Sequence, residues 1–295
     1  MNNFDDILNN ASMQTNENLH YSKEEYAVKK QTERDELFTL SSDTVSEISN
    51  DGEKLKQYLD VQSHFDRYSA VNAMLIFAQM PNATKLGDFG HWKSKNASIK
   101  PNQKAISILE PHEYTKDDGT LGTGYNIKKV FDISQVQASR SMQDLAQPSY
   151  SDRQKLAALI HKPPVPILPV DELPDNLGTQ INPESGAISV RRNLKFAEMF
   201  SSIAASLATL ELKYNESHID KSFSAYCISY LLCKKHGVDT EQFDFSRLGD
   251  VFTNLDTQEA KTEFQTIRDT FSNTSFKLSR ELESLNKTAR NNEAR

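Results

Sequence analysis

The sequence predicts an α+β protein with two domains and a linker between them. Apolar residues recur with a period near 3.6 in several segments, as in amphipathic helices, while short β-prone runs flank turn signals. The chain has 295 residues, which is enough for two domains of about 100 to 200 residues each. Residues 139–177 separate the two patterned halves and form the predicted linker. Its second half, HKPPVPILPVDELP, is Pro-rich and should be extended, because proline restricts itself and the residue before it.

Residues 1–53 predict an acidic, flexible leader. This segment contains twelve Asp or Glu and four Lys or Arg, so its own net charge is −8. The net charge of the whole chain is −7, which leaves +1 for the remaining residues. One helix is expected within it, over 22–38, because Ser22 and Glu25 have the spacing of a capping box.

Residues 54–138 predict a small α+β domain. Apolar positions indicate one helix before Ser69 and another after it, and a serine at this point is a good N-cap for the second helix. Two short strands are expected at 105–110 and 129–134, with a turn around Gly119 between them.

A cationic stretch within this domain predicts binding of single-stranded nucleic acid. Residues 85–109 contain five Lys and one Asp, and aromatic side chains are interleaved with the lysines. Lysines bind phosphates, and aromatic rings stack on unpaired bases. We therefore predict DNA contacts from two groups of residues. The helices contribute Arg67, Tyr68, Asn72 and Gln79, and the cationic stretch contributes Trp92, Lys93, Lys95, Lys100 and Lys104.

Structural alternatives to these contacts remain open. A lone tryptophan such as Trp92 commonly closes the core of a small domain, and Asn72 could equally satisfy a buried backbone group at the helix junction. The four lysines could be the solvated face of a loop and strand.

Residues 178–255 predict a mostly helical second domain with a β-hairpin around 182–186. Two amphipathic helices follow the hairpin, and residues 256–295 form a further amphipathic helix and a tail. Cys227 and Cys233 are six apart on one predicted helix and point in different directions, so no disulfide is expected.

The first domain resembles the N-terminal single-stranded DNA-binding domain of the antirestriction ArdC family, which is found on conjugative plasmids and mobile elements. The resemblance covers about residues 55–137. Its most specific pieces are Tyr68-Ser69 with Asn72, the AQMPNAT block, Trp92 and VFDIS. It implies binding of single-stranded DNA and protection of incoming DNA during conjugation.

The second domain resembles the zincin-like metallopeptidase domain of the same family. In such peptidases one helix carries His-Glu-x-x-His, whose imidazoles bind zinc and whose glutamate activates water. The corresponding positions here are Ala205, Ser206 and Thr209, and Tyr226 stands where a second helix would supply a carboxylate ligand. Because none of these side chains replaces the lost group, we expect a peptidase-like fold with no catalytic residues, no metal and no other cofactor.

These observations together predict a non-enzymatic, cytoplasmic accessory protein of a mobile element. Its partners would be single-stranded DNA and a protein bound by the second domain or the C-terminal helix. No membrane span is expected, because no apolar run approaches the roughly 20 residues that one requires. Two alternatives remain: a metallopeptidase with unconventional ligands, and a protein-interaction scaffold in which the cationic stretch is incidental.

Overall fold

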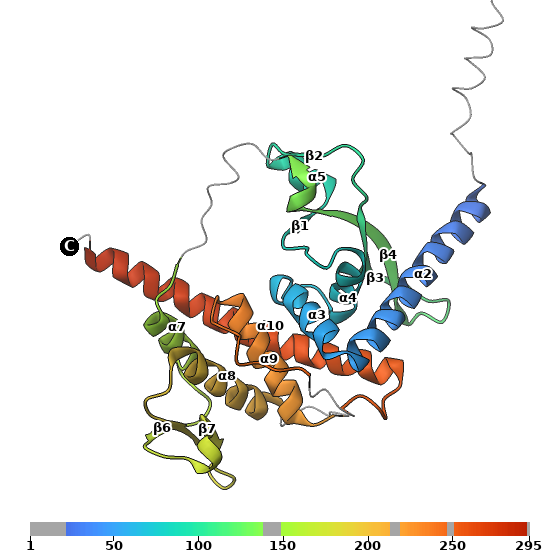
Figure 1. Ribbon diagram of the computed structural model, residues 1–295. Helices are drawn as coiled ribbons and strands as arrows, with labels where there is room; N and C mark the ends of the chain where they lie inside the picture. The colour runs from blue at the N-terminus through green and yellow to red at the C-terminus, as the bar shows by residue number, and fades with distance from the viewer. Residues whose placement is uncertain (1–21, 138–148, 213–218, 247–250, 294–295) are drawn as a thin grey trace, which may run out of the picture.

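The structure is a computed structural model that describes residues 22–137, 149–212, 219–246 and 251–293 (Figure 1). It is an α+β protein in which helices predominate and small sheets lie at the periphery. Within these residues, no helix combines the length and the apolar character needed to cross a membrane.

The first described helix, α2 (Lys23–Asn50), begins as predicted and ends much later. The Oγ of Ser22 accepts from the amide of Glu25 at 3.1 Å, and the Glu25 carboxylate accepts from the Ser22 amide at 2.8 Å. The predicted end at residue 38 is wrong, because Val45 and Ile48 are buried in the core and hold the second half of the helix. Residues 23–50 are therefore not a flexible leader, and residues 1–21 lie outside the described part.

Helices α3 (Gly52–His64) and α4 (Ala70–Gln79) form the predicted pair. The Oγ of Ser69 accepts from the amide of Asn72 at 3.2 Å and so caps α4. Burial of Met74 and Ile76 at 0% exposure places α4 at the centre of this half.

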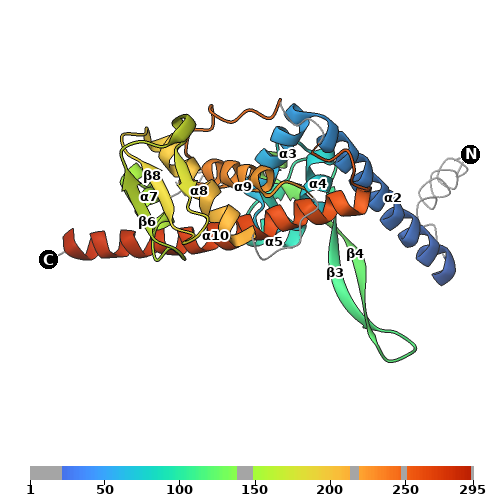
Figure 2. The ribbon, with the colours of Figure 1, turned by 90° about the horizontal axis from the view of Figure 1, so that it is seen from below.

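Two antiparallel sheets accompany these helices. One has the order β1 (Leu86–Gly87), β4 (Leu121–Asp132), β3 (Ile106–Thr115). The other pairs β2 (Ser98–Ile99) with β5 (Val136–Gln137), beside the short helix α5 (Phe89–Ser94) and the 3-10 turn η1 (Ile133–Gln135). Both strands of the predicted hairpin are longer than expected, because they continue into an arm that projects from the body (Figure 2).

Glycines and a proline shape this hairpin arm. Gly122 lies opposite Tyr114 in the register. A Cβ on Gly122 would lie 2.7 Å from the Tyr114 ring, so only glycine lets the ring cover the opposite strand. On the outer edge, the amide and carbonyl of Leu109 bond to the Asn72 side chain and therefore point away from β4. Pro111, two residues further on, faces the same way and offers no N–H there.

The expected linker is wrong for its described part, because 149–177 contains regular structure. Helix α7 (Asp152–Leu159) places Leu159 in the core, and β6 (Ile167–Val170) belongs to a sheet, with the 3-10 turn η2 (Pro174–Asn176) after it. Strand β6 runs parallel to β8 (Ile188–Arg191), which pairs antiparallel with β7 (Thr179–Ile181). The predicted hairpin at 182–186 is the β7–β8 connection.

Three helices complete the chain: α8 (Phe196–Leu212), α9 (Lys221–Lys235) and α10 (Thr257–Glu293). Both views show α10 running along the whole molecule, from α7 at one end to α2 at the other (Figures 1 and 2). Leu55 and Leu59 of α3 belong to the same buried apolar cluster as Phe264 and Phe271 of α10. The two halves therefore share one core.

Candidate nucleic-acid interface

Trp92 lies in the interior of the protein. Its side chain is 1% exposed, and its Nε1 donates to the carbonyl of Phe131 at 3.0 Å. It packs with Ala97 and Val136 between α5 and the β2–β5 pair. Because both faces of the indole are covered, no base can stack on it, and the predicted DNA contact of Trp92 is wrong. Trp92 instead closes the core of this small domain, which is the structural alternative that the sequence left open.

Asn72 and Gln79 bond to the outer edge of β3. The Asn72 amide donates to the carbonyl of Leu109 at 2.8 Å, and its Oδ1 accepts from the Leu109 amide at 2.9 Å. Gln79 forms the same two hydrogen bonds with the backbone of Ser107. Its Nε2 donates to the Ser107 carbonyl and its Oε1 accepts from the Ser107 amide, both at 2.9 Å. Two side chains of α4 thus take the place of a neighbouring strand. The hydrogen bonds of both side chains are made within the fold, which favours the structural alternative for Asn72, and their contacts with DNA stay predictions.

The four predicted lysines lie at the surface. Lys93 and Lys95 are at the end of α5, Lys100 follows β2, and Lys104 precedes β3. Lys100 donates to the carbonyl of Ser134 at 2.7 Å. None of the four forms an ion pair with another described residue, so their charges are free to bind phosphate.

Arg67 and Tyr68, in the turn between α3 and α4, line a groove of about 520 Å³ at the base of the hairpin arm. We call this the Tyr68 groove. Side chains from four parts of the chain meet there, and those that bear on nucleic-acid chemistry are Phe38, Arg67, Tyr68, Tyr125, Lys128 and Arg268.

Aromatic rings form much of the groove. Tyr68 is half-buried and lies edge-on to Phe65, with the ring centroids 5.7 Å apart. Burial raises the pKa of Tyr68 above its ordinary value. Phe38 and Tyr125 pack edge-to-face at 5.6 Å and remain 38% and 37% exposed. The groove thus offers ring surface to a planar ligand.

The lining of the groove carries a formal charge of +2, from three Lys or Arg and one carboxylate. Two further carboxylates, Asp88 and Asp269, lie beside the lining and pair with Lys128 and Arg268. Lys128 lies 2.9 Å from Glu110 and 3.7 Å from Asp88, and the hydrogen bond to Glu110 raises the pKa of Lys128. Asp88 also caps α5 by accepting from His91 at 2.7 Å, which connects the groove to the helix that carries Lys93.

The sequence did not reveal Phe38, Tyr125, Lys128 or Arg268 as groove residues. They lie in different elements, and only the packing of α2 and α10 against the hairpin brings them together. Among them, Tyr125 had one signal: it is an aromatic residue in a strand that contains two nearby glycines.

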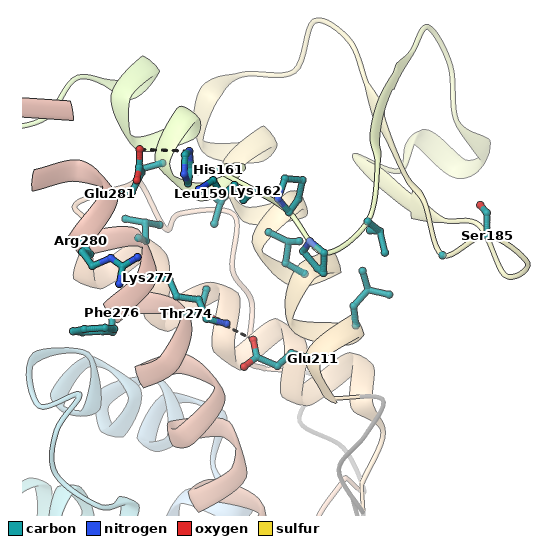
Figure 3. Close-up of a pocket in the computed structure, with 18 of the residues that line it drawn as sticks. Leu159, His161, Lys162, Ser185, Glu211, Thr274, Phe276, Lys277, Arg280 and Glu281 are labelled. Atoms are coloured by element: carbon teal, nitrogen blue, oxygen red, sulfur yellow. Dashed lines mark hydrogen bonds and ion pairs between the residues drawn. The ribbon is translucent and has the colours of Figure 1, made fainter. Parts of the chain in front are cut away.

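A second cavity, of about 1000 Å³, lies between α7, α8, α10 and the β7–β8 connection (Figure 3). His161 Nδ1 is 3.4 Å from a Glu281 oxygen, and Thr274 donates to Glu211 at 3.2 Å. Three Lys or Arg and three Glu line this cavity, so their formal charges cancel. A neutral balance does not attract a polyanion, whereas the balance of the Tyr68 groove does.

The peptidase-like positions on α8 and α9 are engaged in the fold. The hydroxyls of Ser206 and Thr179 are 2.8 Å apart, and the Thr209 hydroxyl donates to the carbonyl of Ala205 at 2.9 Å. The Tyr226 hydroxyl accepts from the amide of Asp244 at 2.6 Å. Among the described residues, no group of three or more His, Cys, Asp or Glu could hold a metal ion.

The fold and its groove define an α+β protein with an aromatic, cationic surface groove. No family model matches the chain, and no curated protein matches it. Two similar solved structures are crystal structures of the antirestriction ArdC protein from the R388 plasmid. The metal-free structure has a TM-score of 0.43 and 15% identity, covering 70% of this chain and 84% of that one. The Mn(II)-bound structure has a TM-score of 0.47 and 12% identity, covering 73% and 85%.

Proposed function

We propose that this chain is a non-enzymatic, single-stranded DNA-binding accessory protein of a conjugative plasmid or mobile element, with an antirestriction-like role in the cytoplasm. The Tyr68 groove is the observation that carries the proposal. It combines exposed ring surface with a formal charge of +2, and these are the two features that unpaired nucleotides require.

The proposed binding mode places a base against Tyr68 and phosphates near Arg67. Stacking of one base on an aromatic side chain contributes about 1 to 3 kcal/mol. Lys93, Lys95, Lys100 and Lys104 would continue the phosphate track beyond the groove, because they are exposed and lack ion-pair partners among described residues. Phosphate contacts of this kind carry no sequence preference.

A fluorescence-anisotropy titration of a labelled single-stranded oligonucleotide tests the proposal. We expect salt-sensitive binding, with a slope of log affinity against log salt of about 0.7 per phosphate contact. Tyr68→Ala should weaken binding about 5- to 150-fold, which corresponds to the stacking energy. Tyr114→Ala, on the exposed part of the arm and outside the groove, is the matched control.

Two outcomes would overturn the proposal. The first is a wild-type protein that does not bind the oligonucleotide, or binds it with no dependence on salt. The second is equal affinity of the Tyr68→Ala and Tyr114→Ala proteins. Metal analysis of the purified chain addresses the metallopeptidase alternative, which a stoichiometric zinc content would favour.

A further inference from the structure

We propose that α10, from the C-terminal half, supplies a phosphate-binding residue to the Tyr68 groove, and that this residue is Arg268. The inference rests on the proposed function. Gln265 and Arg268 both line the groove, together with Arg67 and Tyr68 from the other half of the chain. The nucleic-acid site is therefore built by both halves and is incomplete without α10.

Gln265 anchors α10 beside the turn that carries Tyr68. Its Oε1 accepts from the amide of Ala70 at 3.0 Å, in the first turn of α4. Arg268 is three residues further along α10, so the two side chains share a helix face. The position of Arg268 relative to Tyr68 is thus fixed by a direct contact between the halves.

The hydrogen bonding of Arg268 is incomplete within the protein. Its side chain is only 17% exposed, and one terminal nitrogen lies 2.7 Å from Asp269. Its Nε is enclosed and has no acceptor among the described residues. A guanidinium has five N–H donors, and a partly buried one needs further acceptors. The enclosed Nε is out of reach of a ligand, but the exposed part of the guanidinium lines the groove, where a bound anion would supply an acceptor.

A phosphate matches this need better than other groups. Its oxygens accept two parallel hydrogen bonds from a guanidinium, which gives a stronger contact than a point charge. Arg67, Lys128 and Arg268 also carry like charges around one groove, where Lys128 pairs with Glu110 and Arg268 pairs with Asp269. Phosphate oxygens at the centre would reduce their mutual repulsion.

Substitutions in the full-length chain test the role of Arg268. Arg268→Ala should weaken binding of a labelled oligo(dT) about fivefold to tenfold and lower the salt slope by about 0.7, as expected for one lost phosphate contact. Arg268→Lys should recover the slope but only part of the affinity. Arg280→Ala is the matched control, because Arg280 is exposed on the same helix and lines the other cavity.

The outcomes separate this inference from the proposed function. If wild type binds and Tyr68→Ala weakens binding, but Arg268→Ala behaves like Arg280→Ala, α10 has no part in the site and the inference is wrong. If wild type does not bind at all, the proposed function itself fails. Should Arg268→Ala unfold, Arg268→Gln keeps the length of the side chain, and an unchanged salt slope in that variant would equally overturn the inference.

Discussion

The hydroxyl of Tyr230 donates a 2.6 Å hydrogen bond to Oδ1 of Asp60, across 170 residues of sequence. The same carboxylate oxygen is 2.9 Å from the ammonium group of Lys234. Two side chains of α9 thus hold one side chain of α3, and they join the two halves. Tyr230 is 0% exposed, whereas the Asp60 side chain is 38% exposed, so the contact lies at the edge of the packed core.

Tyr230→Phe should destabilise the protein by about 1.5 to 3 kcal/mol, because it removes a hydrogen bond to a charged group. Chemical denaturation measures this as a lower midpoint with an unchanged slope. Tyr114→Phe is the control, since that ring is 48% exposed on the arm. Equal midpoints for the two variants would show that the Tyr230 hydroxyl contributes nothing to stability.

Gln79→Ala should lower stability by about 1 to 3 kcal/mol, because the amide and carbonyl of Ser107 would lose their partner. Under conditions in which both proteins are fully folded, the affinity of the Gln79→Ala protein for single-stranded DNA should stay within about twofold of the wild-type affinity. Gln103→Ala, at an exposed position, is the control for stability. A large loss of DNA affinity with normal stability would instead support the base contact that the sequence predicted.

Trp92 is the only tryptophan and therefore reports on its own surroundings. Its emission should lie at short wavelength, and iodide should quench it weakly, because the side chain is 1% exposed. Addition of oligonucleotide should leave the emission intensity nearly unchanged. Strong quenching by the oligonucleotide would place a base on the indole and contradict the buried position.

The structure predicts a loss of stability below neutral pH through His236, at the end of α9. Burial, with Lys235 and Lys155 nearby, lowers the pKa of His236 to about 4, although Asp66 acts in the opposite direction. The ordinary value is about 6.5, so the unfolded chain binds the proton first as pH falls. Stability that is present above pH 6.5 is therefore lost progressively towards pH 4.

Denaturation at pH 7 and pH 5 measures this effect. Between these values the wild type should lose about 2 kcal/mol more than His236→Gln does, since each pKa unit corresponds to about 1.4 kcal/mol. His112→Gln, on the exposed arm, should keep the wild-type pH dependence. Identical pH dependence in wild type and His236→Gln would exclude His236 as the source.

The sequence predicted the helices of strong apolar period and missed those held by few apolar residues. Helices α3, α4, α8 and α9 have regular apolar positions and appear where expected. The second half of α2 is polar overall, and its place depends on a few buried side chains such as Val45 and Ile48. Helix α7 is short, and its burial depends on contact with α8 and α10.

The site was partly predictable for a similar reason. Arg67 and Tyr68 are adjacent, so the sequence alone placed a cation beside an aromatic ring. The role of Trp92 was not decided by its neighbours in sequence, because a lysine-rich surface and a buried indole coexist in the same short helix. Arg268 could not be predicted, since its place in the groove depends on the docking of α10.

Pro111 has a consequence for the behaviour of the protein at high concentration. A projecting hairpin with an uncovered strand edge is a common starting point for sheet growth between molecules, which leads to aggregation. At Pro111 an added strand would find no donor, so growth from this edge is interrupted close to the body of the protein. The β3 edge of the long arm is therefore protected at its base against pairing with a strand of another copy of the chain.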